Sequence, residues 1–251
     1  FIENQPPETL DWLKLREKHD HSILAFELPE RTNSQPSFMG VDTGSPHGVR
    51  IAPELWTQWR KDHPHAPTTL SAYVMFEIGL VVSEETWADT IDLNGLKLNN
   101  VPVGPMNLHE KQIYPEGTIA VIGLQALRQM DAYFDNANHE IFVNPLDTAP
   151  VKYPHNMIGA VFTPAGLDGG SLIAHVVKNS PAADAGIHNG DVLLKIDDLD
   201  VTPWRTTLGI LPLSRFFAQA PSTVIDLTLR RDGKTMVTNV TLKIILGPTQ
   251  E

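Results

Sequence analysis

At 251 residues, the chain is long enough for two average domains, and each half can bury a core. Hydrophobic residues make up 41% of it and charged residues 20%, which excludes the disordered and fibrous classes. The formal net charge of -11 argues against a nucleic-acid partner, because phosphate contacts need clustered Lys and Arg. All of this net charge falls on residues 1–150, which hold 10 basic and 21 acidic residues, whereas residues 151–251 hold 9 of each.

The sequence has no cysteine, which removes disulfides, thiolate metal sites and cysteine nucleophiles. This composition fits a bacterial cytoplasm or periplasm and does not distinguish them. The longest apolar run, residues 71–82, has about twelve residues and carries Glu77, whereas a membrane span needs about twenty, so we expect no span. Because the chain begins at Phe1, we expect that a signal peptide, an upstream domain or an expression sequence has been removed.

The elements expected in the first half are mostly short strands. Residues 8–18 have helical spacing and belong to an approach segment, residues 1–21. From Ser22 onward, β-prone runs are broken by Gly, Pro and Asn. We expect strands at 23–28, 37–41, 70–76, 118–122 and 140–143, and a hairpin over 132–143.

A linker is expected near residue 150, because residues 144–154 contain three prolines. Beyond it, the pattern predicts strands at 171–177, 192–196, 223–230 and 235–242, and helices at 181–185 and around 213–220. A turn at 231–234 joins the last two strands. The sequence pattern therefore predicts two mainly β domains.

The sharpest local motif is Asp42-Thr43-Gly44-Ser45, which follows the apolar residues 38–41. It places a carboxylate on a tight loop, where the Gly44 amide and the Thr43 hydroxyl can orient it. A strand that ends in such a turn is common, so the motif alone does not establish chemistry.

A second segment, residues 120–127, contains Ile122-Gly123 and is followed by the aromatic hairpin. Together the two segments resemble the retropepsin-like aspartic proteases, over residues 22–146. The resemblance implies a β-barrel lobe in which Asp42 is catalytic, Thr43, Gly44 and Ser45 support it, and Ile122 and Gly123 pack beneath the loop. It also implies an aspartic endopeptidase that acts on polypeptides.

That chemistry needs two carboxylates that share one proton and activate a water. The sequence has one Asp-Thr-Gly, so the second Asp must come from a homodimer partner or from a protease lobe upstream of Phe1. In this family a flap lies between the two motifs, and the best candidate is Glu77-Ile78-Gly79. An ordinary core strand with one glycine is the alternative there, and His47 either lines the cleft or lies in an exposed turn.

Other residues that could belong to a metal or substrate site are expected to have ordinary structural roles. His63 and His65 flank a proline without a third matched ligand, so we expect a solvated loop, no metal and no cofactor. Trp56 and Trp59 have helical spacing and are expected on the core face of a helix rather than in a substrate pocket. The acidic pair Asp197-Asp198 is expected in a turn.

The second half carries an ordered series of motifs, among them residues 179–187 (Asn-Ser-Pro-Ala-Ala-Asp-Ala-Gly-Ile) and Gly190-Asp191. This series resembles a bacterial PDZ domain over residues 154–245, a partly open β-barrel with two helices. The resemblance implies that the loop Met157-Ile158-Gly159-Ala160 captures a peptide's terminal carboxylate, and that residues 160–162 pair with the peptide. Residues 213–219 would form the other wall. The alternative is a domain that only supports its neighbour.

The combined interpretation has an approach segment (1–21), a retropepsin-like lobe (22–146), a linker (147–153), a PDZ domain (154–245) and a tail (246–251). Its location would be the periplasm or cell envelope, with a peptide or protein C-terminus at the PDZ domain. Two rivals remain: a catalytically inactive peptide-binding or scaffold protein, and the C-terminal part of a two-lobed aspartyl protease.

Overall fold

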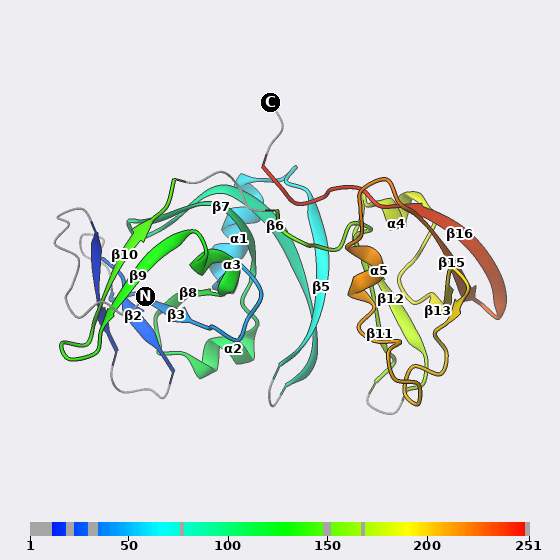
Figure 1. Ribbon diagram of the computed structural model, residues 1–251, viewed down its shortest axis with the longest axis horizontal. Helices are drawn as coiled ribbons and strands as arrows, with labels where there is room; N and C mark the ends of the chain where they lie inside the picture. The colour runs from blue at the N-terminus through cyan, green and yellow to red at the C-terminus, as the bar shows by residue number, and fades with distance from the viewer. Residues whose placement is uncertain are drawn as a thin grey trace. The chain divides into compact units, whose positions relative to one another are not determined.

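The computed structural model describes residues 12–18, 23–29, 35–75, 78–147, 152–166 and 169–248 (Figure 1). The chain is mainly β, which confirms that part of the predicted fold class. It divides into two compact units, which are described separately: the first comprises residues 1–66, 86–151 and 248–251, and the second comprises residues 67–85 and 152–247. The predicted domain boundaries, 22–146 and 154–245, stay predictions. They assign residues 67–85 to the first domain, whereas the structure groups these residues with the second unit.

The first unit is built on one large sheet. Its path of hydrogen-bonded strands is β5-β6-β7-β4-β8-β3-β2-β1-β10-β9, of which β5 and the start of β6 belong to the second unit. Within the described residues this path is open at both ends, so the predicted retropepsin-like barrel is not confirmed. The elements of the first unit are β1 (Leu13–Glu17), β2 (Ala25–Glu27), β3 (Phe38–Val41), β4 (Val49–Ile51), α1 (Pro53–Asp62), the end of β6 (Gly79–Leu93), β7 (Leu96–Pro105), α2 (Leu108–Ile113), β8 (Thr118–Ile122), α3 (Leu124–Leu127), β9 (Met130–Asp135) and β10 (Glu140–Pro145).

The expectation of a helix over residues 8–18 is wrong for its described part, because β1 is a strand. Leu15 is buried, while its neighbours Lys14 and Arg16 are exposed, and this alternation is the period of a strand. β1 pairs with β10 on one side and with β2 on the other. Pairing within the sheet thus overrides a weak helical pattern.

Buried apolar side chains of β1–β4 and β6–β10 form most of the core of the first unit. Leu15, Phe26, Met39 and Ile122 are among its fully buried members. Trp56 and Trp59 of α1 are partly buried and pack against this core, as the spacing predicted.

The second unit contains the predicted PDZ elements. Its sheet order is β11-β12-β13-β15-β16, with β14 paired to β13. The hairpin of β5 and β6 belongs to the same unit, and β5 contacts β11. The elements are β5 (Thr68–Met75), the start of β6, β11 (Ala160–Pro164), β12 (Leu172–Val176), α4 (Pro181–Asp184), β13 (Val192–Ile196), β14 (Leu199–Asp200), α5 (Ser214–Phe217), β15 (Val224–Arg231) and β16 (Lys234–Thr241).

Local hydrogen bonds explain why α4 and the turn into β13 form. Ser180 caps α4 by accepting the amide of Ala183 at 3.2 Å, and Pro181 occupies the first turn, where its missing N–H costs nothing. Asp191, which is 1% exposed, accepts two 2.7 Å hydrogen bonds from Arg231 and one from the His188 amide. This paired carboxylate fixes the turn to the last hairpin of the domain.

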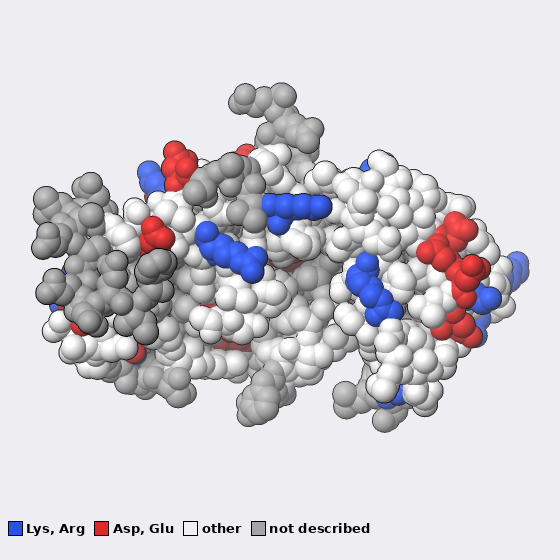
Figure 2. Space-filling view, in the orientation of Figure 1, with Lys and Arg blue, Asp and Glu red and all other residues white. Residues whose placement is uncertain are grey.

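Charged side chains of the second unit lie both in its strands and in its turns. Acidic side chains gather over the region of β13 and β15 on the face shown in Figure 2. The predicted turn at Asp197-Asp198 joins β13 to β14, and the Asp197 carboxylate accepts the Asp226 amide at 2.9 Å. Within the described ranges, no helix is long and apolar enough to cross a membrane.

Candidate functional site

The Asp42 loop lies where two parallel strands end. β3 and β8 run side by side in the same direction, so the residues that follow them meet at one edge of the sheet. The Asp42 amide donates to Ile122 O at 3.0 Å, and the Gly123 amide donates to Gly48 O at 2.8 Å. A Cβ on Gly123 would lie 2.5 Å from His47 O, so only glycine fits against this loop. The structure thus brings Ile122 and Gly123 against the Asp42 loop.

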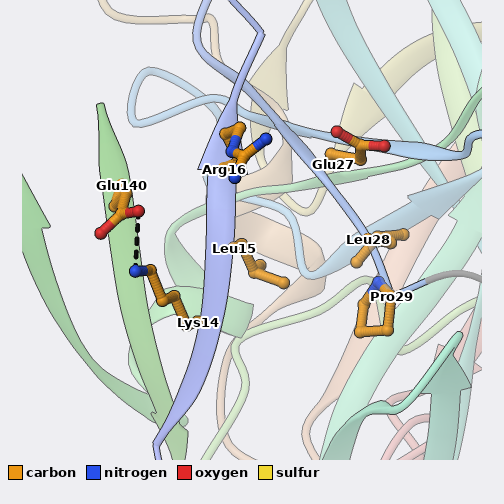
Figure 3. Close-up of a pocket in the computed structure, with 7 residues that line it drawn as sticks. All are labelled: Lys14, Leu15, Arg16, Glu27, Leu28, Pro29 and Glu140. Atoms are coloured by element: carbon orange, nitrogen blue, oxygen red, sulfur yellow. Dashed lines mark ion pairs between the residues drawn. The ribbon is translucent and has the colours of Figure 1, made fainter. Parts of the chain in front are cut away.

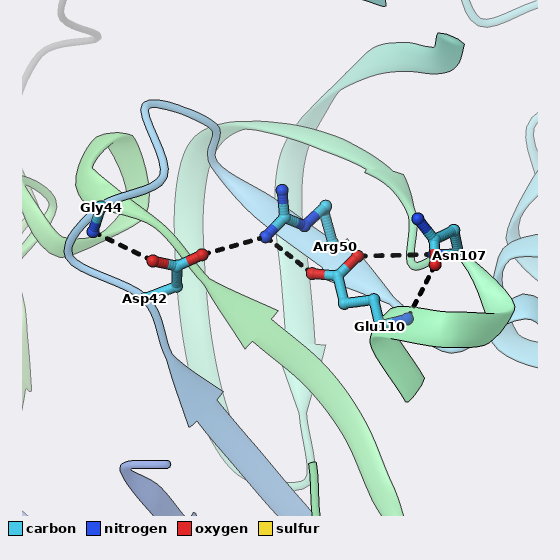
Figure 4. A network of polar contacts seen from close by, with 5 residues as sticks. All are labelled: Asp42, Gly44, Arg50, Asn107 and Glu110. Carbon is cyan, nitrogen blue, oxygen red and sulfur yellow. Dashed lines mark hydrogen bonds and ion pairs between the residues drawn. The ribbon is translucent and has the colours of Figure 1, made fainter. Parts of the chain in front are cut away.

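The Asp42 carboxylate belongs to a network of three charged groups (Figure 4). One carboxylate oxygen accepts the Gly44 amide at 3.0 Å, and the other lies 3.4 Å from Nη2 of Arg50. The same Nη2 lies 2.6 Å from Oε1 of Glu110. The Arg50 and Glu110 side chains are only 8% and 3% exposed, whereas that of Asp42 is 36% exposed. The buried pair is therefore Arg50 with Glu110, and Asp42 lies at its solvent side.

Glu110 is held in place by the start of α2. Asn107 accepts the Glu110 amide at 2.7 Å, and Glu110 accepts the Asn107 amide at 3.4 Å, which together form a capping box. Burial raises the pKa of Glu110, while the attraction of Arg50 opposes that rise. Sequence reasoning missed both Glu110 and Arg50, although the spacing Asn107-x-x-Glu110 is a readable helix-start signal.

The remaining residues predicted around Asp42 have different environments. Thr43 is exposed, while Ser45 is 6% exposed and its hydroxyl has no hydrogen-bond partner among the described residues. Of the predicted flap, Glu77 lies outside the described residues. Ile78 and Gly79 lie at the turn between β5 and β6, where the Ile78 amide donates to Met75 O at 3.2 Å. His47 is half-buried.

The His63-Pro-His65 segment follows α1. The His63 ring stacks on Trp59 at 4.2 Å, and its Nδ1 lies 2.9 Å from Trp59 O. Over the ranges that the structure describes, no three His, Cys, Asp or Glu side chains are grouped to hold a metal ion.

The structure also forms a shallow hollow near β1 (Figure 3). Lys14 and Glu140 form a 2.8 Å ion pair beside it, and Leu15 and Leu28 lie beneath its charged rim. The full lining is Lys14, Leu15, Arg16, Glu27, Leu28, Pro29 and Glu140. Exposed ion pairs of this kind contribute little energy, and nothing in the hollow indicates a reaction.

The predicted carboxylate loop lies directly before β11. Met157, Ile158 and Ala160 are buried, and the Met157 amide donates to Phe217 O at 2.9 Å. Gly159 has a φ of 68°, and a Cβ there would lie 2.4 Å from Ser180 Cβ. Both facts require glycine, so the loop is held tightly against the start of α4.

Asn156 organises this loop, and sequence reasoning missed it. Its Oδ1 accepts two backbone amides, from Ile158 at 3.0 Å and from Gly159 at 3.2 Å. Its Nδ2 donates to Ala160 O at 2.6 Å. Two successive amides of the loop therefore converge on a single oxygen, which is the arrangement that a carboxylate ligand uses.

The hairpin of β5 and β6 makes hydrogen bonds with Asn156 and with Tyr153, three residues earlier. Thr69, which is fully buried, donates its hydroxyl to Asn156 O at 2.6 Å, and Tyr153 donates its hydroxyl to Glu85 at 2.6 Å. In β11, Ala160 and Phe162 face the domain core, and the alternate residues Val161 and Thr163 are also buried. β5 therefore contributes to the burial of β11.

His155 connects the loop to the C-terminal segment of the second unit. Its Nε2 accepts the amides of Ile245 and Leu246, both at 3.0 Å, so Nδ1 carries the proton and donates to Tyr153 O at 2.8 Å. Burial lowers the pKa of His155 from its usual value of 6.5, against the effects of the Tyr153 carbonyl and Glu85. The folded protein thus favours the neutral ring.

Comparison with known proteins identifies part of the second unit. Residues 172–231 match the PDZ domain family. The chain carries a PDZ domain. The match begins at β12, so the PDZ assignment of loop 157–160 rests on its place before β11, which pairs with β12. No curated protein matches the sequence.

Three similar solved structures are proteases. A variant of the HtrA-type protease AlgW with a decapeptide is 15% identical, with 70% of this chain and 59% of that chain covered and a TM-score of 0.28. AlgW itself with a decapeptide is 12% identical, with 91% and 73% covered and a TM-score of 0.29. The serine endoprotease from Yersinia pestis is 14% identical, with 95% and 85% covered and a TM-score of 0.26. The chain thus spans 59% of the length of the first of these proteins.

These comparisons contradict the aspartic endopeptidase predicted from Asp42-Thr43-Gly44, and that prediction is wrong. The neighbours are HtrA-type and serine proteases, and none of these findings supports an aspartic lobe. Among the described residues the structure places a cation, Nη2 of Arg50, 3.4 Å from the Asp42 carboxylate, whereas the aspartic mechanism requires a second carboxylate beside it. A homodimer partner or an upstream lobe was expected only as the source of that second carboxylate. Without the aspartic mechanism, neither of them is required.

We predict that the buried pair stabilises the first unit more than Asp42 does. Glu110→Gln removes the buried carboxylate that lies 2.6 Å from the Arg50 guanidinium and should lower the free energy of unfolding by about 3 kcal/mol. Asp42→Asn, at a more exposed carboxylate, should cost less than about 1 kcal/mol. Urea unfolding followed by tryptophan fluorescence measures both. An equal loss in the two variants would contradict this assignment.

We also predict a histidine-dependent acid sensitivity of the second unit. Because folding lowers the pKa of His155, the unfolded chain binds a proton first as the pH falls through about 6.5. The free energy of unfolding should therefore decrease between about pH 7 and pH 5. In His155→Gln, the side-chain carbonyl can accept the same amides but does not titrate, so the decrease should be smaller. Identical pH dependence in both proteins would exclude His155 as the source.

Proposed function

We propose that this chain binds extended polypeptide segments at its PDZ domain, with the free C-terminal carboxylate of the ligand received by the loop 157–160. The observation that supports this most directly is the convergence of the Ile158 and Gly159 amides on one oxygen, at 3.0 Å and 3.2 Å, in a domain that matches the PDZ family. Backbone amides in this arrangement are suited to a carboxylate because each contributes a charge-assisted hydrogen bond.

The strand that follows the loop suits a peptide partner. Among the described strands, β11 is the terminal one of its sheet, and β5, which contacts β11, belongs to the other sheet path. A peptide can add to the edge of a terminal strand through its own backbone, and the affinity then depends little on its side chains.

The side chains of α5 define the opposite wall. Leu213 and Phe217 are buried in the domain core, and Phe217 contacts Phe162 of β11 with ring centres 5.9 Å apart. Phe216 is only partly buried, with Arg215 stacked at 4.6 Å over its ring. Phe216 is therefore the α5 side chain that we propose meets the ligand.

The proposal concerns binding and includes no catalytic step. The first unit would then act with the PDZ domain as a scaffold, and the alternative of a PDZ domain that only supports its neighbour predicts no peptide binding. The proposed location remains the periplasm or cell envelope, which follows from the resemblance of residues 154–245 to bacterial PDZ domains.

We predict that binding depends on Gly159. Gly159→Ala places a methyl group 2.4 Å from Ser180 Cβ and should weaken peptide binding at least about tenfold, because the loop amides must move. Gly166→Ala is the matched control, since Gly166 also has a positive φ but a Cβ there would meet nothing within 4 Å. Fluorescence anisotropy of the full chain with a decapeptide library carrying free C-termini measures binding. Failure of the library to bind the wild-type chain and every variant would overturn the proposed function.

A further inference from the structure

The polar atoms of the carboxylate loop are already used within the chain. Asn156 Oδ1 accepts the Ile158 and Gly159 amides, and Nδ2 donates to Ala160 O, so one side chain is bonded to three backbone groups of the loop. Asn156 precedes the loop, and its oxygen occupies the place toward which both amides point. A ligand carboxylate and Asn156 cannot hold those two amides simultaneously.

From this geometry, and resting on the proposed function, we propose that Asn156 is an internal ligand of the PDZ domain: its side-chain amide mimics the terminal carboxylate of a peptide and must be displaced before a peptide end can bind. The domain is thereby selective for a charged end group. A carboxylate forms charge-assisted hydrogen bonds, roughly twice as strong as those of a neutral amide oxygen, and so it competes with Asn156. A peptide that ends in a neutral amide has no such advantage.

A hydrogen bond from the β5–β6 hairpin supports the arrangement in which the Asn156 side chain accepts the loop amides. Thr69 donates to the backbone oxygen of Asn156 at 2.6 Å, so the residue is held through its main chain while its side chain closes the loop. Both Thr69 and the loop residue Ile158 are fully buried. Displacing the Asn156 side chain therefore requires a rotation about its side-chain bonds rather than a movement of the backbone.

The energetic consequence is a reduced apparent affinity. When a binding-competent state is only a fraction of the population, the apparent dissociation constant rises by the inverse of that fraction. Removing the internal ligand should therefore tighten peptide binding, whereas replacing it with a true carboxylate should weaken it. These opposite directions distinguish displacement from a general disturbance of the loop.

The test uses the full chain and two decapeptide libraries, identical except that one has free C-termini and the other amidated ones. Asn156→Ala should bind the free-acid library about tenfold more tightly than wild type, because no side chain competes for the amides. Asn156→Asp retains the acceptor geometry and adds a charge, so it should bind the same library at least about tenfold more weakly. Asn189→Ala removes a comparable bond, from the Val176 amide to Asn189 Oδ1 at 2.6 Å, and should leave affinity unchanged.

The outcomes separate this inference from the proposed function. Equal affinity of wild type, Asn156→Ala and Asn156→Asp for the free-acid library would overturn the internal ligand and leave peptide binding intact. Equal affinity of wild type for the free-acid and amidated libraries would overturn both the internal ligand and the carboxylate contact of the proposed function. If Asn156→Ala does not fold, Asn156→Asp decides alone, since its unchanged or tighter binding contradicts the proposal. Absence of binding to wild type and every variant overturns the proposed function itself.

Discussion

The hydrogen bonds of Asn156 are the interaction on which the functional account depends. Two amides of the loop, the carbonyl of Ala160 and the hydroxyl of Thr69 all meet at this residue. A tight loop before an edge strand has several backbone groups that the sheet cannot satisfy, and burial makes each unsatisfied group costly. Asn156 satisfies them locally. The same bonds preserve, in the free domain, the arrangement that a peptide end requires.

The Asp42 network illustrates a different lesson about local motifs. A loop with the sequence Asp-Thr-Gly can orient a carboxylate, and the structure does place Gly44 and Gly123 as such a loop requires. Function, however, depends on the charges that meet the carboxylate from other elements. Arg50 on β4 and Glu110 on α2 make this loop part of a buried ion-pair network. The Asp-Thr-Gly motif predicts the conformation of the loop, whereas Arg50 of β4 determines the charge that the Asp42 carboxylate meets.

The parts of the fold that sequence reasoning predicted well are those encoded locally. β8 and β13 begin and end at the predicted residues, and α4 begins at the predicted residue and ends one residue early. The residues around β1 were assigned to a helix because pairing with β10 and β2 cannot be read from a single segment. Asn156, Arg50 and Glu110 were missed for the same reason, since their roles depend on contacts made after folding. The inclusion of residues 67–85 in the second unit is also a tertiary property.

The central claim is that a free peptide C-terminus binds at the loop before β11. Titration of the ¹⁵N-labelled full chain with the free-acid decapeptide library, followed by amide chemical shifts, tests it most directly. The account predicts that the amides of Ile158, Gly159 and the β11 residues shift first, together with the side-chain NH₂ of Asn156, and that the amidated library has a much smaller effect. Shifts confined to residues outside the loop and β11, or no shifts at all, would contradict the account.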